Sequence, residues 1–252
     1  MVKRMKLEVC CGSYQDCLAA DAGGASRIEL NSALFMGGLT PNAATVRLAK
    51  ETVKLPIVCM VRPRGAGFCY NETEVKEMFA MAKDLLDAGS DGLAFGFLTE
   101  DASIDVELTK KMVELIHSYK KEAVFHRAFD CVKDAKAAIE TLIDLHVDRI
   151  LTSGLENSAP AGKACIKDLV AEYGDRIEIL AGAGINPTNV ADFVKETGVG
   201  QVHSSAKTWF IDPTTSTEKV TYAYHNADDY DGVSVDTVKA LVENLGGVEC
   251  IG

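Results

Sequence analysis

Short apolar runs alternate with amphipathic stretches eight times along the chain, and this alternation constrains the fold more than any other feature. The runs predict strands at residues 7–11, 27–30, 56–61, 91–96, 123–126, 149–152, 177–181 and 200–203. The stretches between and after them predict helices at residues 14–22, 42–52, 72–88, 105–119, 134–145, 162–173, 188–196 and 235–244. Strands that alternate with helices form a parallel sheet with right-handed crossovers.

Eight such units in 252 residues, with no composition shift or linker between them, have the size of one closed (β/α)8 TIM barrel over residues 1–252. A doubly wound open sheet is the alternative architecture. That fold usually carries a glycine-rich nucleotide loop after its first strand, and Cys11-Gly12-Ser13 is not such a loop. The sequence therefore predicts an α/β protein with a single TIM-barrel domain.

Residues 208–232 do not fit the short connections of a barrel, because they form a long polar segment between the last strand and the last helix. Loops longer than ~15 residues are usually lids, binding loops or disordered segments. The segment follows the carboxyl end of the eighth strand, so it is predicted to be a lid over the barrel mouth. A solvated acidic loop is the alternative.

The charge and cysteine pattern exclude several classes of protein. A net charge of −11 and a pI of about 5.0 disfavour binding to nucleic acids and to anionic membranes. The chain shows no signal peptide and no apolar run long enough to span a bilayer. Its eight cysteines are scattered without Cys-x-x-Cys pairs, which is typical of reduced thiols in the cytoplasm.

The segment Phe125-His126-Arg127-Ala128-Phe129-Asp130 places three chemically active side chains where the fifth strand ends. In a TIM barrel this is the carboxyl edge of the sheet, where active sites lie. The cluster therefore indicates a functional site that includes His126, Arg127 and Asp130. The alternative is a packed histidine beside a structural Arg127–Asp130 ion pair.

The alternation of strand side chains predicts which of them face the barrel interior. The interior set is Glu8, Cys10, Arg27, Glu29, Arg62, His126, Thr152 and His203. Buried charges of both signs must be paired, so a structural ion-pair plug is one interpretation. Two histidines that titrate near neutral pH favour acid–base chemistry or metal binding instead. The predicted catalytic residues are Glu8, Glu29, Arg62, His126, Asp130 and His203.

The turns after the seventh and eighth strands carry a second signal, because barrels often bind phosphate there through backbone N–H groups. The glycines in these turns could instead serve tight packing. No lysine ends strands four to seven, which disfavours a Schiff-base aldolase. The predicted substrate or anion site consists of Arg64, Arg127, Thr152, Gly182, Gly184, Ser204 and Ser205.

Seven segments together resemble the CutC family, which is named for copper homeostasis. The segments are residues 7–10, 27–30, 37–41, 62–65, 125–130, 151–154 and 202–206. The resemblance covers nearly the whole chain. It implies a cytoplasmic TIM barrel that forms a homo-oligomer, either a dimer or a tetramer, and that contributes to copper tolerance through Cu(I) binding or trafficking.

The resemblance assigns a copper ligand to Cys10, which matches the cysteine on the family's first strand. Many members carry a second cysteine directly after the Arg-Ile-Glu-Leu strand, where this chain has Asn31. Cu(I) requires soft thiolate or thioether ligands. Cys11 faces the other way by strand alternation, and Met78 and Met81 suit helix packing. Cys10 is therefore predicted to be a weak copper site.

Three functions remain open from the sequence. The first is a copper-binding homeostasis protein, with a metal ion as its partner. The second is a TIM-barrel enzyme that acts on a small polar or phosphorylated metabolite, and the third is an interaction scaffold.

Overall fold

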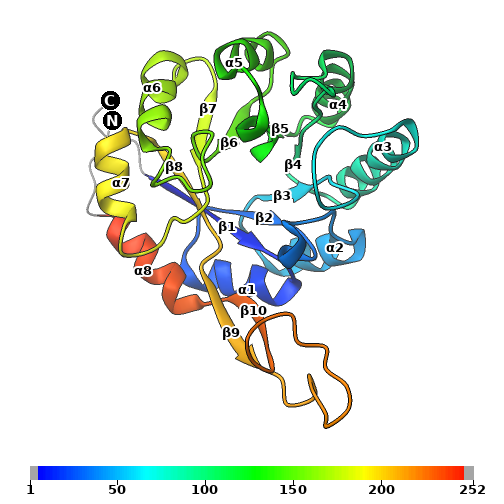
Figure 1. Cartoon of the computed structure of the whole chain (residues 1–252), viewed down its shortest axis with the longest axis vertical. Helices are drawn as coiled ribbons and strands as arrows, with labels where there is room; N and C mark the ends of the chain where they lie inside the picture. Colours follow the sequence, from blue (N-terminus) through cyan, green and yellow to red (C-terminus); the bar gives the residue numbers. More distant parts are fainter. Residues whose placement is uncertain (1–4, 247–252) are drawn as a thin grey trace.

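The computed structural model describes residues 5–246 and contains a closed barrel of eight parallel strands (Figure 1). The strands follow one another around the barrel in chain order, and β1 pairs with β8 to close it. This confirms the predicted (β/α)8 architecture. The strands are β1 (Lys6–Cys11), β2 (Arg27–Leu30), β3 (Ile57–Met60), β4 (Gly92–Phe95), β5 (Glu122–Phe125), β6 (Arg149–Thr152), β7 (Glu178–Ala181) and β8 (Gln201–Ser204).

Eight helices cover the outside of the barrel, and the main hydrophobic core lies between them and the strands (Figure 1). Among the helices in residues 5–246, none has the length and apolar character needed to cross a membrane. The helices are α1 (Tyr14–Gly23), α2 (Ala43–Thr52), α3 (Glu72–Asp87), α4 (Val106–Ser118), α5 (Ala135–Asp144), α6 (Lys163–Tyr173), α7 (Val190–Thr197) and α8 (Val235–Gly246). Two short 3-10 helices precede α2 and α5, namely η1 (Leu34–Met36) and η2 (Arg127–Cys131).

The helix starts follow from local sequence. The Asn71 side chain accepts hydrogen bonds from the backbone N–H groups of Thr73 and Glu74, and the Glu74 carboxylate accepts from the Asn71 N–H. This reciprocal capping box satisfies N–H groups that have no partner inside α3. Asp105 and Asp134 cap α4 and α5 more simply, each with a carboxylate oxygen that accepts one backbone N–H three residues on.

The barrel interior is divided into an apolar and a polar side. Strands β3 to β5 contribute Val58, Met60, Ala94 and Val124, which form a small hydrophobic cluster separate from the main core. On the polar side, strand register brings charged residues together: Glu8 lies opposite Arg27 on β2 and opposite His203 on β8. The site described below lies between these two sides.

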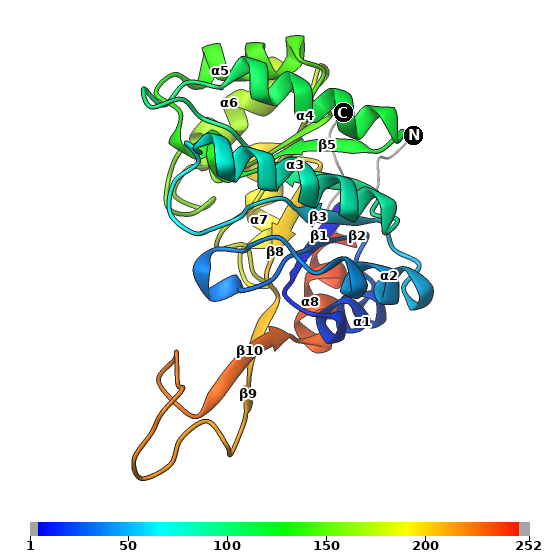
Figure 2. The same cartoon turned by 90° about the vertical axis from the view of Figure 1, so that its right-hand side faces the viewer.

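The segment predicted to be a lid contains two further strands, β9 (Lys207–Ile211) and β10 (Asp229–Val233), which pair antiparallel. We refer to residues 207–233 as the arm. It extends away from the barrel in both ribbon views (Figures 1 and 2). Its base is fixed because the buried Asp16 carboxylate accepts the Val233 N–H at 2.8 Å. In this conformation the arm does not cover the barrel mouth.

Candidate functional site

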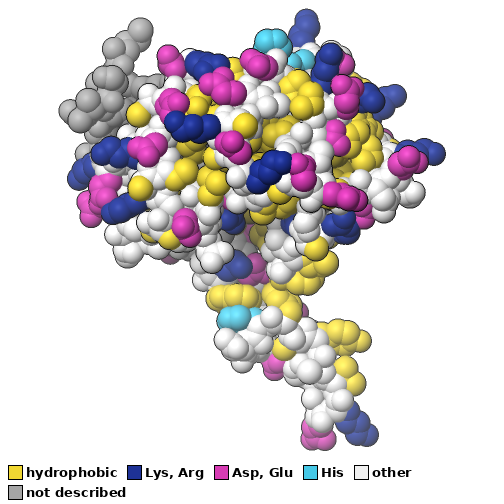
Figure 3. Space-filling model, turned by 45° about the horizontal axis from the view of Figure 1, so that its top comes forward, with side chains coloured by type: hydrophobic (Ala, Val, Ile, Leu, Met, Phe, Trp, Pro, Cys, Tyr) yellow, Lys and Arg dark blue, Asp and Glu magenta, His cyan; other side chains and the backbone are white. Residues whose placement is uncertain are grey.

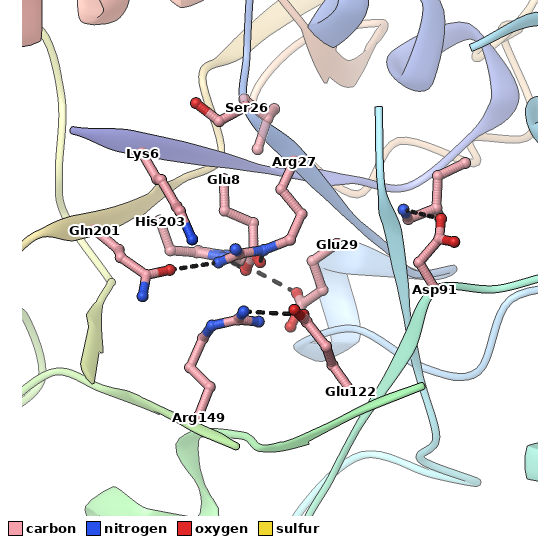
Figure 4. Close-up of polar contacts among 12 residues, drawn as sticks. Lys6, Glu8, Ser26, Arg27, Glu29, Asp91, Glu122, Arg149, Gln201 and His203 are labelled. Atoms are coloured by element: carbon pink, nitrogen blue, oxygen red, sulfur yellow. Dashed lines mark hydrogen bonds and ion pairs between the residues drawn. The ribbon is translucent and has the colours of Figure 1, made fainter. Parts of the chain in front are cut away.

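A buried ion-pair cluster joins β1, β2 and β8 inside the barrel (Figure 4). Glu8, whose exposed fraction is 2%, accepts a hydrogen bond from Arg27 Nε on one oxygen. Its other oxygen lies 2.8 Å from His203 Nδ1. Arg27 also donates to Gln201 Oε1 at 2.9 Å. The Glu8 carboxylate is therefore placed between two cationic groups.

This pairing determines the charges of the cluster. Burial alone would raise the pKa of Glu8, but the Arg27 guanidinium and the His203 hydrogen bond hold it well below its usual range. Burial alone would lower the pKa of His203, yet Glu29, Cys10 and Glu8 together raise it well above its ordinary value. At neutral pH the cluster therefore contains an ionised Glu8 and a protonated His203.

A buried arginine, Arg149, lies below this cluster toward the amino end of the barrel and forms ion pairs with two partly exposed carboxylates. The Arg149 side chain donates to Glu122 at 2.9 Å (Figure 4) and to Glu178, also at 2.9 Å. Sequence reasoning missed Arg149 because it assigned the interior face of β6 to Thr152. The acidic partners on the neighbouring strands β5 and β7 were the signal that could have identified it.

Above the ion pairs, a cavity of about 120 Å³ opens at the carboxyl end of the barrel. Four of the predicted catalytic residues, Glu29, Arg62, His126 and His203, line it together, while Glu8 lies behind His203. The lining residues are Cys10, Glu29, Asn31, Gly37, Met60, Arg62, Phe68, His126, Arg127, Leu151 and His203. We refer to this cavity as the mouth pocket.

One wall of the mouth pocket carries the groups that could hold a metal ion. Cys10 Sγ, a carboxylate oxygen of Glu29 and a ring nitrogen of His203 all lie within 4.8 Å of one another. Asn31 Nδ2 donates to Glu29 at 2.9 Å and contacts Cys10 Sγ at 3.5 Å. Burial raises the pKa of both the Cys10 thiol and the Glu29 carboxyl. Met60 lines the same pocket, and its inward position two residues before Arg62 could have identified it from sequence.

The opposite wall is formed by His126 and Arg62. His126 Nδ1 accepts a hydrogen bond from the Ala128 N–H at 3.1 Å. Burial and the nearby Arg62 charge lower the pKa of His126 to about 3, so its ring is neutral. Gly96 at the end of β4 leaves room for this ring, because a Cβ there would lie 2.6 Å from His126 Cε1. Arg62 packs over the Phe68 ring at 5.1 Å.

Two predicted site residues, Arg127 and Asp130, form an ion pair at the edge of the pocket. Asp130 pairs with Arg127 Nε at 2.8 Å and accepts hydrogen bonds from the Thr152 hydroxyl and the Ser153 N–H. The prediction that Thr152 faces the interior is wrong. On β6 the interior face carries Arg149 and Leu151, which lines the pocket, and Thr152 points to η2.

The remaining predicted anion-binding residues lie outside the lining of the mouth pocket. Arg64 pairs with Glu74 and packs over Tyr70. A Cβ at Gly182 would lie 2.8 Å from Leu151 Cδ1 and 3.1 Å from His203 Cβ, so this glycine has a packing role.

The Ser204 hydroxyl donates to the Ile185 carbonyl at 2.7 Å, Ser205 is exposed, and Gly184 has a φ of +80°. An anion site at the turns that follow β7 and β8 stays a prediction.

The sequence model described as the CutC family matches residues 5–208. A CutC family protein of Treponema denticola is 40% identical over 248 residues, which is 97% of this chain and 100% of the relative. The mouse copper homeostasis protein cutC homolog is 41% identical over 201 residues, covering 80% of this chain and 73% of its own.

The solved CutC structure from Streptococcus agalactiae superimposes with a TM-score of 0.75 at 32% identity. The superposition covers 80% of this chain and 98% of that structure. By sequence and by structure, this chain is a member of the CutC family.

Proposed function

We propose that this protein contributes to copper homeostasis by binding Cu(I) as cargo at Cys10 and His203. The observation that carries the proposal is the convergence of Cys10, Glu29 and His203 within 4.8 Å on one wall of the mouth pocket. Cu(I) prefers thiolate, thioether and imidazole ligands over carboxylates. Cys10 and His203 fit this preference, and the Met60 thioether lines the same pocket, whereas Glu29 offers only hard oxygen atoms. The names of the relatives support the same role.

The proposed binding is weak, for two reasons. Asn31 occupies the position where a second cysteine would complete a soft ligand pair, and its amide contacts Cys10 Sγ at 3.5 Å. In addition, both donors carry protons in the folded protein, because the pKa values of Cys10 and His203 are raised. A metal ion must displace these protons before it binds.

Competition with a Cu(I) chelator under anaerobic conditions tests the proposal. We expect the wild type to take up one Cu(I) per chain with low affinity, and Cys10→Ser to lose this binding. Cys165→Ser is the matched control, because Cys165 lies on α6 and is not among the residues that line the pocket. Tight stoichiometric binding to the wild type would contradict the proposed weakness. Equal binding by Cys10→Ser would refute the assignment to Cys10.

We propose a reducing cytoplasm as the location. Seven cysteines lie within residues 5–246 and all of them are free thiols, while Cys250 lies outside the described residues. Unpaired cysteines in a chain of this length are typical of a reducing compartment. Such a compartment also favours the Cu(I) state of the proposed cargo.

We propose that the chain forms a homodimer through the arm. Ile211 and Tyr222 are 72% and 82% exposed, and Trp209, Phe210, Val220, Tyr224 and Tyr230 are also exposed on the arm. The arm projects from the body in the space-filling view, with hydrophobic side chains along it (Figure 3). An isolated two-stranded hairpin is only marginally stable in water, and exposed apolar patches mark interfaces. A second copy could cover both arms at once, because a two-fold axis uses the same patch on each protomer.

The double variant Ile211→Ser/Tyr222→Ser is expected to weaken this dimer by at least about tenfold, since truncation of interface anchors costs more than about 1.4 kcal/mol. Analytical ultracentrifugation over a range of concentrations measures the change. Leu48→Ser is the control, because Leu48 is also exposed but lies on α2. A wild type that sediments as a monomer at tens of micromolar, or a double variant that dimerises equally well, would rule out the arm as the interface.

A second candidate function is catalysis on a small polar or phosphorylated metabolite. The observation that favours it is the group of ionisable side chains with shifted pKa values, Glu29, His203 and Cys10, around one cavity. Such clusters suit acid–base chemistry. A thermal-shift screen of metabolites tests this function without any assumption about copper.

A further inference from the structure

Arg62 differs from the other arginines inside and around the barrel. Arg27, Arg127 and Arg149 each form an ion pair with a carboxylate. Arg62 is 7% exposed, yet no carboxylate among residues 5–246 lies within 4.0 Å of its nitrogens. Its contacts are backbone carbonyl oxygens: Nη1 donates to Gly37 and Gly38 at 3.1 and 3.2 Å, and Nη2 donates to Ala66 at 2.6 Å.

A buried charge without an opposite charge is costly, because the low dielectric of the interior does not replace its hydration. The carbonyl groups stabilise the guanidinium but leave its charge uncompensated. Arg62 also lines the mouth pocket, which is the open space beside it. An anion bound there would supply the missing charge.

His126 lines the same pocket and has an unused hydrogen-bond donor. Because Nδ1 accepts the Ala128 N–H, the proton of the neutral ring must be on Nε2. Nε2 is buried and has no hydrogen-bond partner among the described residues. Buried polar atoms are nearly always paired, so an exception in a pocket indicates a partner supplied by a ligand.

We infer that the mouth pocket binds a small monocarboxylate through Arg62 and His126. This inference deepens the second candidate function and does not depend on copper. The carboxylate compensates the charge of Arg62 and accepts the proton of His126 Nε2.

The size and charge of the pocket define the class of acid. Its volume of about 120 Å³ is slightly below the roughly 150 Å³ of a cavity that holds benzene, so it suits a ligand of about six non-hydrogen atoms. Glu8 is paired with Arg27 and His203, Glu29 lies 3.9 Å from His203 Nε2, and Arg127 is paired with Asp130. Among the described residues that line the pocket, Arg62 therefore brings the one unpaired positive charge, which matches a monoanion better than a dianion such as phosphate. A polar wall of Asn31, Cys10 and Glu29 suits a hydroxyl group, so a short hydroxy acid fits best.

Isothermal titration calorimetry with glycolate and lactate tests the inference on the full chain. We expect saturable binding with a dissociation constant of about 1 mM or tighter, within the range that ligand efficiency allows for so few atoms. Glycolamide and lactamide have the same shape without the charge and are expected not to bind. Equal binding of acids and amides, or no saturable binding of either acid up to tens of millimolar, would overturn the inference. So would binding of inorganic phosphate in place of the acids.

The variant His126→Asn removes the Nε2 donor while its amide oxygen can still accept the Ala128 N–H. We expect it to bind lactate at least about tenfold more weakly. His146→Asn is the matched control, because His146 is exposed and asparagine tolerates its φ of +60°. Unchanged lactate affinity in folded His126→Asn would overturn the assignment. If this variant does not fold, the comparison of acid with amide on the wild type still decides the inference.

The same variants separate this inference from the copper proposal. His126→Asn is expected to keep its Cu(I) binding, since His126 is not in the Cys10, Glu29 and His203 group. Loss of lactate binding by His126→Asn with its Cu(I) binding intact would show that the two sites are separate.

Discussion

Replacing Glu8 with glutamine is expected to lower the free energy of unfolding by about 3–5 kcal/mol, the usual cost of removing one partner from a buried ion pair. Glutamine keeps the size of the side chain but removes its charge. Arg27 and His203 would then remain buried without the carboxylate that both of them contact. The effect is large because both cations are buried, with exposed fractions of 5% for Arg27 and 9% for His203.

The pH dependence of this effect follows from the directions of two pKa shifts. The pKa of Glu8 is held below its ordinary value of 4.5, so its contribution to stability is complete above pH 4.5 and is lost as the pH falls toward its folded pKa. The pKa of His203 is raised above 6.5, so its contribution is complete below pH 6.5 and is lost as the pH rises through the folded value. Both contributions are complete only between about pH 4.5 and 6.5.

Urea unfolding of the wild type and Glu8→Gln between pH 3 and 9 measures both effects. The difference in the free energy of unfolding between the wild type and Glu8→Gln should shrink below pH 4.5, because the Glu8 carboxylate of the unfolded wild type then begins to take up a proton. Glu140→Gln is the control, because Glu140 forms an exposed ion pair with Arg176 and its loss should hardly change the midpoint. If the urea midpoint of Glu8→Gln lies as close to that of the wild type as the midpoint of Glu140→Gln does, the cluster does not stabilise the fold.

Much of the candidate site could be predicted from sequence because strand side chains alternate with a period of two. Once Val9 and Leu30 are assigned to the helix layer, Glu8, Cys10 and Glu29 must face the interior, and the register places Cys10 opposite Glu29. The position of His126 follows in the same way from Phe125, which lies in the main core. The parallel strand order then brings these side chains to one end of the barrel.

The same rule failed on β6 because its sequence does not decide the alternation. Ile150 and Leu151 are both apolar, and Arg149 and Thr152 are both polar, so hydrophobicity gives no preferred face. Only the ion pairs of Arg149 with Glu122 and Glu178, which lie on neighbouring strands, fix the choice. These contacts depend on the three-dimensional register and cannot be read from β6 alone.

The two strands of the arm were missed for a related reason. Its two strands are separated by residues 212–228, and the segment around them is polar enough to look like a loop. In β9 three apolar residues follow one another from Trp209 to Ile211, so no alternation of apolar and polar residues marks a strand. Two of their three partners on β10 are the acidic Asp229 and Asp231. The family match ends at residue 208, so the family resemblance did not describe the arm either.

Asn31→Cys is expected to raise the affinity for Cu(I) by about 100-fold, at the upper end of what a single group near a metal site contributes. The side chain at position 31 already lies beside the proposed ligand, since Asn31 Nδ2 is 3.5 Å from Cys10 Sγ. A cysteine there would place a second soft sulfur next to the first, and Cu(I) prefers two thiolates to a thiolate and an amide.

Asn31→Ser separates the new thiol from the loss of the amide, because serine is similar in size to cysteine but offers only a hard oxygen. Chelator competition should show the gain for Asn31→Cys alone, and the gain should disappear in the Cys10→Ser/Asn31→Cys double variant. If Asn31→Ser gains as much as Asn31→Cys, the amide hinders copper sterically and the second thiol adds nothing. If neither variant gains, Cu(I) does not bind beside Cys10, and the copper role of this chain must depend on other residues.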